Sequence, residues 1–197
     1  KKDLRFKGFF RTMIFVPCTT SLVAYSIIFR SLFANNGLVN YVLVNLGILD
    51  KPYNFLTQPF AAKIVIILAL LWRWTGYNMV FFLSGLQNIE YSVYEAAKID
   101  GASAIQTFFK ITVPLLKPTI LLTAIMSTNG TLQLFDESIN LTDGGPANAS
   151  ISMSHYIYNL CFKYVPNFGY AAAMSFFILL LVAVLAFIQM RVGDKRD

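Results

Sequence analysis

The chain has 197 residues, of which 56% are hydrophobic and 13% are charged, and its mean hydropathy is +0.59. So few charged residues cannot cover a water-soluble globule of this size, which excludes a soluble domain and indicates a protein of the lipid bilayer. The net charge of +6 includes no basic run longer than two residues, so it indicates membrane topology rather than nucleic-acid binding.

Four apolar stretches are long enough to cross a hydrocarbon core of about 30 Å, which takes roughly 20 helical residues. The stretches are continuous, whereas barrel strands would alternate with a period of two. The sequence therefore predicts an all-α, polytopic membrane protein that forms one transmembrane domain over residues 1–197. The predicted transmembrane helices are residues 9–33, 61–86, 114–135 and 169–190.

Lysine and arginine are distributed unequally between the two sides of these helices. Eleven lie in the terminal segments and in or beside residues 87–113, and four lie in or beside residues 34–60 and 136–168. Short cytoplasmic loops carry the excess of positive charge. Both termini of this chain and residues 87–113, here called the polar insert, are therefore predicted to be cytoplasmic, and the other two segments are predicted outer loops.

The first predicted span contains Pro17, about two turns inside the membrane. Proline lacks a backbone N–H and its ring clashes with the preceding turn, so a helix kink is predicted there. The kink either serves packing alone or leaves room for a cavity or a moving joint. In the outer loop that follows, the amphipathic stretch Leu38–Leu49 is predicted to lie on the membrane surface.

The second predicted span carries Arg73 ten residues beyond Lys63, at a depth of about 15 Å. A charge there costs several kcal/mol unless it is paired or hydrated. Arg73 is therefore expected either to face a water-filled passage or to pair with a carboxylate such as Asp136 or Glu137 for assembly alone. Trp74 and Tyr77 lie three residues apart on one helix face, too deep for an interfacial aromatic belt.

The third predicted span is interrupted by polar residues. Ser127, Thr131 and Leu134 follow the spacing i, i+4, i+7 of one helix face, and Asn129 and Gln133 form a neighbouring stripe. Neutral hydrogen-bonding groups in a stripe suit an uncharged polyhydroxylated solute, because each hydroxyl needs a partner once it leaves water. The alternative is hydrogen bonding between helices, which only holds the bundle together.

The polar insert is predicted to fold as two helices around a glycine. Ser92 precedes a helix-forming run that ends at Gly101, and a second helical run, residues 102–112, is stopped by Pro114. Ala96 and Ala97 allow another protein surface to approach closely, Glu95 offers a charge to a partner, and Gly101 permits a sharp bend. The insert is therefore predicted to contact a soluble partner.

No constellation in the chain suggests catalysis. The single histidine, His155, has no second metal ligand nearby in the sequence, and no phosphate-binding loop or nucleophile elbow occurs. The chain is therefore predicted to be neither an enzyme nor a metal or cofactor protein, so any energy it uses comes from another chain.

The insert resembles the cytoplasmic signature of the inner-membrane permease subunits of bacterial ABC importers, which reads E-A-A, three residues, G, nine residues, I-x-L-P. The matching residues are Glu95, Ala96, Ala97, Gly101, Ile111 and Pro114, with Val113 in place of leucine. Five further segments are similar to the carbohydrate branch, which includes the maltose-type and multiple-sugar permeases. They are Phe9-Phe10-Arg11-Thr12 through Val16-Pro17, Trp72-Arg73, Gly85-Leu86-Gln87, Leu141-Thr142-Asp143-Gly144-Gly145-Pro146 and Phe168-Gly169-Tyr170-Ala171-Ala172-Ala173.

The resemblance covers nearly the whole chain, but two positions depart from the family pattern. Glu90 and Gly76 stand where prolines are common, so the local helix geometry is expected to differ from the family pattern at these two positions. The four spans would be the last four of a permease that usually has six or more.

The resemblance implies that the matched residues of the insert form a coupling helix seated in a cleft of an ATP-binding subunit. It also implies a sugar pathway that includes Trp74, Tyr77, Ser127 and Thr131. Leu134 replaces a polar pathway residue of the maltose permease, so the sugar or its pose is expected to differ.

The implied location is the bacterial inner membrane, and the implied mechanism is alternating access. The implied partners are a homologous second permease, two ATP-binding subunits that hold ATP and magnesium, an extracellular sugar-binding protein, membrane lipid and a sugar substrate. Two alternatives stay open: a permease for another solute such as glycerol phosphate or polyamine, and a membrane scaffold without a pathway.

Overall fold

The structure is a computed structural model that describes residues 6–193. Within these residues every regular element is helical, which confirms the predicted all-α class. The α-helices are α1 (Lys7–Thr19), α2 (Leu22–Leu32), α3 (Leu38–Asn45), α4 (Pro59–Gln87), α5 (Tyr91–Ile99), α6 (Ala104–Thr107), α7 (Val113–Leu115), α8 (Lys117–Leu132), α9 (Asp136–Thr142), α10 (Met153–Tyr158) and α11 (Phe168–Gly193). Shorter turns are η1 (Phe108–Thr112) and η3 (Asn159–Lys163), both π-helical, and the 3₁₀ turn η2 (Pro146–Asn148).

Two of these helices are long and apolar enough to cross a membrane unaided. They are α4, with 29 residues, and α11, with 26 residues, where the second and fourth spans are predicted. Two bent helix pairs also pass the length and composition test, so the described residues hold two to four candidate spans.

The first predicted span, residues 9–33, is not one helix. α1 and α2 meet at a bend of 102°, and α1 alone, with 13 residues, is only about 20 Å long. The break follows Pro17 by three residues, where the Thr20 N–H bonds to the Pro17 carbonyl oxygen. The Thr19 and Thr20 hydroxyls both donate to the Val16 carbonyl oxygen, at 2.9 and 3.0 Å. These local bonds replace the next helical turn, so the predicted kink becomes a sharp corner.

The third predicted span, residues 114–135, is shorter in the structure. α8 covers Lys117–Leu132, and the preceding helical segment Ala104–Leu115 meets it at 65°. Pro114 therefore belongs to the insert side of the bend rather than to the membrane helix. At 16 residues, α8 is about 24 Å long.

Both predicted outer loops contain helices. In residues 34–60, α3 is tied to the following chain by Asn40, whose side chain exchanges hydrogen bonds with the backbone of Tyr53 at 2.8 and 2.9 Å. Residues 136–168 include α9, α10 and η3. A buried amide that satisfies backbone groups gives such a short connection a defined shape.

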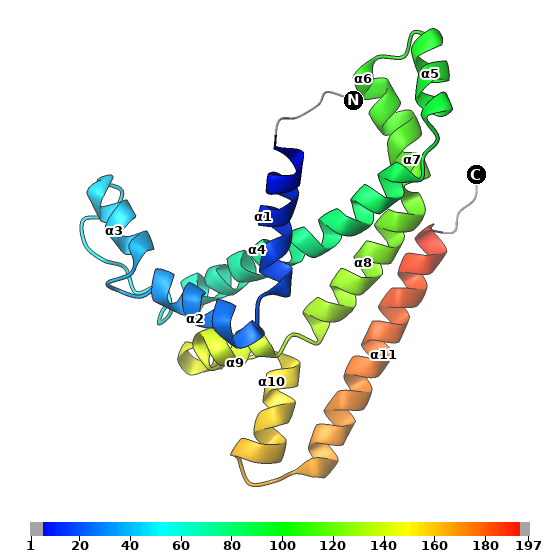
Figure 1. Cartoon of the computed structure of the whole chain (residues 1–197). Helices are drawn as coiled ribbons and strands as arrows, with labels where there is room; N and C mark the ends of the chain where they lie inside the picture. The colour runs from blue at the N-terminus through cyan, green and yellow to red at the C-terminus, as the bar shows by residue number, and fades with distance from the viewer. Residues whose placement is uncertain (1–5, 194–197) are drawn as a thin grey trace.

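A small apolar core lies where α2, α4 and α9 meet. Its buried members are Tyr25, Phe29, Ile66, Ala69 and Leu141. α8 and α11 pack side by side, and the insert, α5 and α6, stands at the opposite end of the molecule from the α10–α11 connection (Figure 1). α1 begins, and α11 ends, on the insert side (Figure 1).

Candidate functional site

The polar insert folds as helix, glycine and helix, with boundaries that differ from the predicted ones. α5 begins at Tyr91, after Glu90, and not after Ser92. The Ser92 hydroxyl instead donates to the Glu90 carboxylate at 3.2 Å. Gly101 follows α5 with φ of +74°, a left-handed conformation that glycine adopts without the steric cost of a Cβ. The glycine therefore allows the reversal between the two helices.

The second half of the insert starts at a capping box. Ser103 accepts from the Gln106 N–H at 3.3 Å, and the Gln106 side chain accepts from the Ser103 N–H at 2.8 Å. Reciprocal caps of this kind fix a helix start, which places it at Ala104, two residues later than predicted. The Thr112 hydroxyl donates to the Tyr94 hydroxyl at 3.3 Å and so ties this half back to α5.

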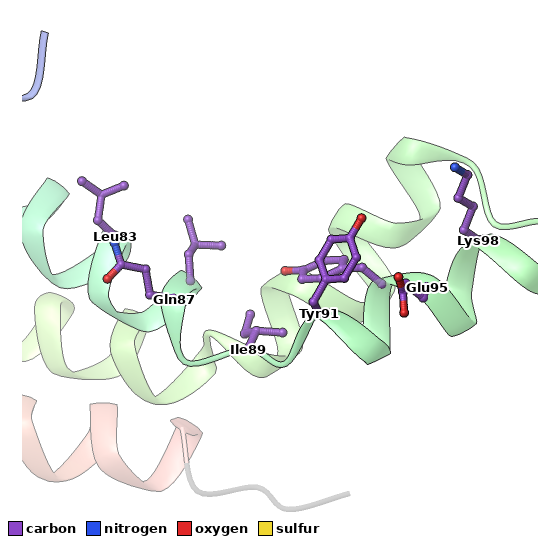
Figure 2. Close-up of a pocket in the computed structure, with 8 residues that line it drawn as sticks. Leu83, Gln87, Ile89, Tyr91, Glu95 and Lys98 are labelled. Atoms are coloured by element: carbon purple, nitrogen blue, oxygen red, sulfur yellow. The ribbon is translucent and has the colours of Figure 1, made fainter. Parts of the chain in front are cut away.

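A pocket of about 520 Å³ lies between the end of α4 and α5. It is lined by Leu83, Leu86, Gln87, Ile89, Tyr91, Tyr94, Glu95 and Lys98. Figure 2 shows Leu83 and Gln87 on α4, Ile89 in the connection, and Tyr91, Glu95 and Lys98 along α5. The spacing i, i+4, i+7 of these last three residues places them on one helix face. The pocket thus offers an apolar floor beside two charged groups.

The outer surface of the insert is apolar at its tip. Ile99 is 86% exposed, and Ile105, across the glycine turn, is also exposed. Ala96 is exposed, but Ala97 is only 4% exposed. Ala97 therefore packs inside the insert and does not lie on its exposed surface. The apolar tip was missed, although an isoleucine directly before Asp100-Gly101 is a signal that was present in the sequence.

The last two motif residues lie where the insert joins the membrane helix. Ile111 is half-buried in η1, and Pro114 is exposed in α7. They therefore connect α5 to α8 through the 65° bend and do not join Glu95 on the pocket wall.

A groove of about 480 Å³ lies between α4 and α8. Its lining residues are uncharged: Leu70, Leu71, Trp74, Thr75, Asn78, Met79, Phe82, Ser127 and Thr131. Trp74, Ser127 and Thr131 are thus brought together, as the sequence predicts. An aromatic face beside hydroxyl groups can bind an uncharged polyol through ring contact and hydrogen bonds.

Tyr77 stands beside this groove as part of a row of rings along α4. Its ring meets Trp74 edge to face at a centroid distance of 5.4 Å and Phe81 at 5.0 Å. Its hydroxyl lies 3.6 Å from the Met126 sulfur on α8. Tyr77 thus supports the Trp74 ring.

Asn78 also lines the groove, although it was not predicted there from the sequence. Its Nδ2 donates to the Trp74 carbonyl oxygen at 3.1 Å. Its buried Oδ1 has no hydrogen-bond partner within residues 6–193. Its position one turn after Trp74 was the available signal.

Five residues predicted on the pathway do not line the groove: Arg73, Tyr77, Asn129, Gln133 and Leu134. Leu134 follows the end of α8, so it leaves the helix face shared by Ser127 and Thr131, and it packs against the apolar core. Gln133 donates to Asn129 at 2.6 Å and lines a separate hollow beside α11. The helical spacing used for Leu134 fails because the helix ends two residues earlier.

Arg73 is paired, as one of the two alternatives predicts. Its guanidinium lies 3.4 Å from the Glu137 carboxylate, and the Tyr25 hydroxyl donates to the same carboxylate oxygen at 2.5 Å. The guanidinium also lies 5.6 Å from the centre of the Tyr25 ring. This cluster joins α2, α4 and α9, and Arg73 is not among the groove-lining residues.

His155 is fully buried at the start of α10, beside the glycine turn after α9. Its Nδ1 lies 2.8 Å from the Ser138 hydroxyl, and its Nε2 lies 3.9 Å from the Asp143 carboxylate. Lys163 donates to that carboxylate at 3.2 Å. Burial lowers the pKa of His155, the Asp143 carboxylate opposes this shift, and the Lys163 charge adds to it. Within residues 6–193, no group of three or more His, Cys, Asp and Glu residues is placed to hold a metal ion.

Residues 2–196 match the family model described as binding-protein-dependent transport system inner membrane component. The chain belongs to this family. The predicted resemblance is confirmed, and the protein is a multi-pass membrane protein. The chain is 56% identical, over 98% of its length, to the lactose transport system permease protein LacF of Rhizobium radiobacter. It is 33% identical, also over 98% of its length, to the arabinooligosaccharides transport system permease protein AraP of Bacillus subtilis. These names describe transport permeases and not enzymes, in agreement with the sequence.

Solved structures with the same fold come from bacterial importers of alginate, an acidic polysaccharide. One matches 97% of this chain and 68% of its own with a TM-score of 0.84; at 24% identity it shows the fold alone. Another is a complex with an alginate pentasaccharide-bound periplasmic protein; it matches 98% of this chain and 66% of its own with a TM-score of 0.76 and 25% identity. The chain spans only 65% and 62% of the lengths of LacF and AraP.

Proposed function

We propose that the chain is part of a transmembrane subunit of a carbohydrate ABC importer. In this function the subunit forms a sugar translocation pathway and couples it to ATP hydrolysis by partner subunits through alternating access. The observation that carries the proposal is the insert, in which an exposed apolar tip and a left-handed Gly101 stand at one end of the membrane helices. The names of the relatives support a carbohydrate as the solute.

Coupling follows from the exposed tip and the rigid connection behind it. A partner that encloses Ile99 gains free energy because exposed apolar area leaves water. The Thr112–Tyr94 hydrogen bond holds α5 against the chain that leads into α8. Movement of the partner is therefore passed to α8, which carries Ser127 and Thr131 of the groove. ATP and magnesium bind to two such partner subunits and not to this chain.

The groove between α4 and α8 is the proposed sugar-contacting surface. An exchange between two states of the bundle opens it to one side of the membrane and then to the other. A homologous second permease packs beside it, and lipid surrounds the pair. The large apolar area that α11 exposes supports this membrane setting.

In the proposed orientation the insert and both termini of this chain face the cytoplasm, at the bacterial inner membrane. The excess of Lys and Arg on that side supports this orientation. An extracellular sugar-binding protein docks at the opposite end, where α9, the Gly144–Pro146 turn and α10 lie. The periplasmic protein in the alginate transporter complex supports such a partner.

A phosphorylated or otherwise dianionic solute fits this groove poorly. Such a solute needs cationic partners, and the lining residues of the groove are uncharged. Arg73 precedes the groove residue Trp74 directly in the sequence, but its guanidinium is already paired with the Glu137 carboxylate. An uncharged sugar is therefore the preferred cargo.

Substitution of Gly101 tests the coupling role. Position 101 is open, because a Cβ added there would meet no atom within 4 Å, so a side chain at this position acts through the backbone alone. Gly101→Val is expected to uncouple ATP hydrolysis from uptake, because a β-branched residue is a strong outlier at positive φ. Gly101→Asn is the matched control, since asparagine tolerates this conformation. Uptake and ATPase activity are measured in vesicles that contain the assembled complex.

Gly101→Asn is expected to keep uptake close to the wild-type level. In Gly101→Val, the amount of sugar taken up per ATP hydrolysed is expected to fall about tenfold or more. Equal, unimpaired uptake by both variants would contradict the coupling role of the insert.

A further inference from the structure

The Trp74 ring lies against a glycine of the neighbouring helix. At Gly130 on α8, a Cβ would stand 2.9 Å from both Cζ2 and Cη2 of the Trp74 indole. Atoms in proteins do not approach a Cβ so closely, so any side chain at position 130 displaces the indole. Because Gly130 has no side chain, it leaves a recess on α8, and the Trp74 indole of α4 occupies this recess.

This recess lies among the groove residues of α8. Ser127 is three residues before Gly130 and Thr131 is the next residue, and both hydroxyl-bearing residues line the groove. Trp74 lines the same groove from α4. The depth to which the indole sinks toward α8 therefore sets how much space is left in front of the two hydroxyl groups.

The Trp74 ring is also contacted by Tyr77, a residue of its own helix. Tyr77 meets the Trp74 ring edge to face at 5.4 Å and reaches the Met126 sulfur on α8 at 3.6 Å. Tyr77 and Gly130 both border the indole, and the groove that Trp74 lines is the open space beside it, so a displaced indole is expected to move into the groove. Closely packed aromatic rings rarely have a second free rotamer.

We infer that Gly130 is a positioning residue that sets the orientation of Trp74 and, through it, the largest carbohydrate that the groove admits. This inference rests on the proposed function. Gly130 touches the indole and does not line the groove. A methyl group at position 130 should therefore exclude oligosaccharides more strongly than monosaccharides.

The test is a double-mutant cycle in the complete complex, reconstituted in vesicles with its binding protein. The four forms are wild type, Gly130→Ala, Trp74→Phe and the double variant. Uptake is measured for a monosaccharide, a disaccharide and a trisaccharide that the wild type carries, and the melting temperature of each complex is recorded. Phenylalanine lacks the Cζ2 and Cη2 atoms that meet position 130, so it relieves the contact.

Gly130→Ala is expected to lower trisaccharide uptake by about tenfold or more relative to the monosaccharide, because small displacements in a binding site have large effects. In the double variant this selective loss should disappear, and the two substitutions should show a favourable coupling in melting temperature. The matched control is Gly85→Ala, at the same pair of helices, where a Cβ would meet Thr119 and Leu116. Gly85→Ala should change the uptake of all three sugars by the same factor. Its effect on the melting temperature should add to that of Trp74→Phe without coupling.

The inference is overturned if Gly130→Ala reduces uptake of all sugars equally, or if Trp74→Phe fails to restore the larger sugar. A melting cycle without coupling between positions 74 and 130 overturns it as well, and this readout needs no transport. A wild-type complex that takes up no carbohydrate would instead contradict the proposed function, while the melting cycle still decides whether Gly130 positions Trp74.

Discussion

Arg73 illustrates how a single charge is accommodated among apolar helices. Glu137 is only 3% exposed, yet its carboxylate accepts from both Arg73 and the Tyr25 hydroxyl. A buried charge is tolerated when a second charge and further hydrogen bonds compensate for the lost water. The cluster therefore explains why an arginine is tolerated within α4.

Removal of one member of this cluster should destabilise the protein. Glu137→Ala leaves the Arg73 guanidinium and the Tyr25 hydroxyl without their shared partner. The expected cost is about 3 kcal/mol, measured as the stability of the purified complex against heat or denaturant. Asp136→Ala, one residue away on α9, is the control and should cost clearly less. Equal losses in the two variants would show that the cluster contributes nothing beyond helix propensity.

At the scale of elements, α9 and α10 are joined by a buried hydrogen-bond network that fixes the His155 tautomer. The Ser138 hydroxyl donates its one proton to the Ser150 carbonyl oxygen at 2.8 Å. The His155 Nδ1 must therefore carry a proton and donate to the Ser138 oxygen. This leaves Nε2 as a buried acceptor without a hydrogen-bond partner in the described chain.

This arrangement predicts a loss of stability in acid. The pKa of His155 in the folded protein lies below its ordinary value of 6.5, so the unfolded chain binds the proton more readily. Stability from this group is complete above pH 6.5 and is lost as the pH falls from there to the lowered pKa of the folded state. The melting temperature of the complex should accordingly fall as the pH is lowered below the ordinary His155 pKa of 6.5.

His155→Asn separates this effect from general acid denaturation. Its amide can donate to Ser138 as Nδ1 does, but it does not titrate. In this variant, the part of the pH dependence of the melting temperature that comes from His155 should disappear. The part that comes from the other titratable groups should stay. An unchanged pH profile in His155→Asn would exclude titration of this histidine as a cause.

The broken helices show why element boundaries were harder to predict than element existence. Composition marked residues 9–33 as one apolar run, and Pro17 marked a weak point. The 102° corner depends on the packing of α2 against α9 and of α1 against α4. At Gly76 of α4, a Cβ would collide with the Ile14 carbonyl oxygen of α1, so the backbones of the two helices are in contact. The sequence of neither helix predicts this contact.

At the scale of the whole molecule, the groove and the insert are joined through α8. The insert leads into α8 at a 65° bend, and α8 is held to α11 by the Gln189–Thr128 hydrogen bond at 2.8 Å. α8 also carries one wall of the groove. This continuity gives the proposed coupling a physical route, because a packed helix moves as a unit.

Tyr77 tests the groove at this scale. Tyr77→Ala removes the ring that supports Trp74 and is expected to lower uptake about tenfold or more, since the aromatic wall loses its orientation. Assembly of the complex, checked by co-purification, should be unchanged because the ring is only partly buried. Tyr77→Phe keeps the ring contacts and should keep most of the uptake. Failure of Tyr77→Ala to assemble would favour a packing role instead.

Sequence was sufficient for the membrane environment, the all-α class, the family and the glycine reversal at Gly101. These properties depend on composition or on residues at fixed, short spacing, and both can be read directly from the sequence. The fold was required to select Glu137 rather than Asp136 as the partner of Arg73, to exclude Leu134 from the groove and to place the Trp74 ring against Gly130. Arg73 and Glu137 are 64 residues apart, and their meeting depends on where α9 turns back against α4. Side chains so distant in sequence are brought together by packing, and no local pattern encodes that packing.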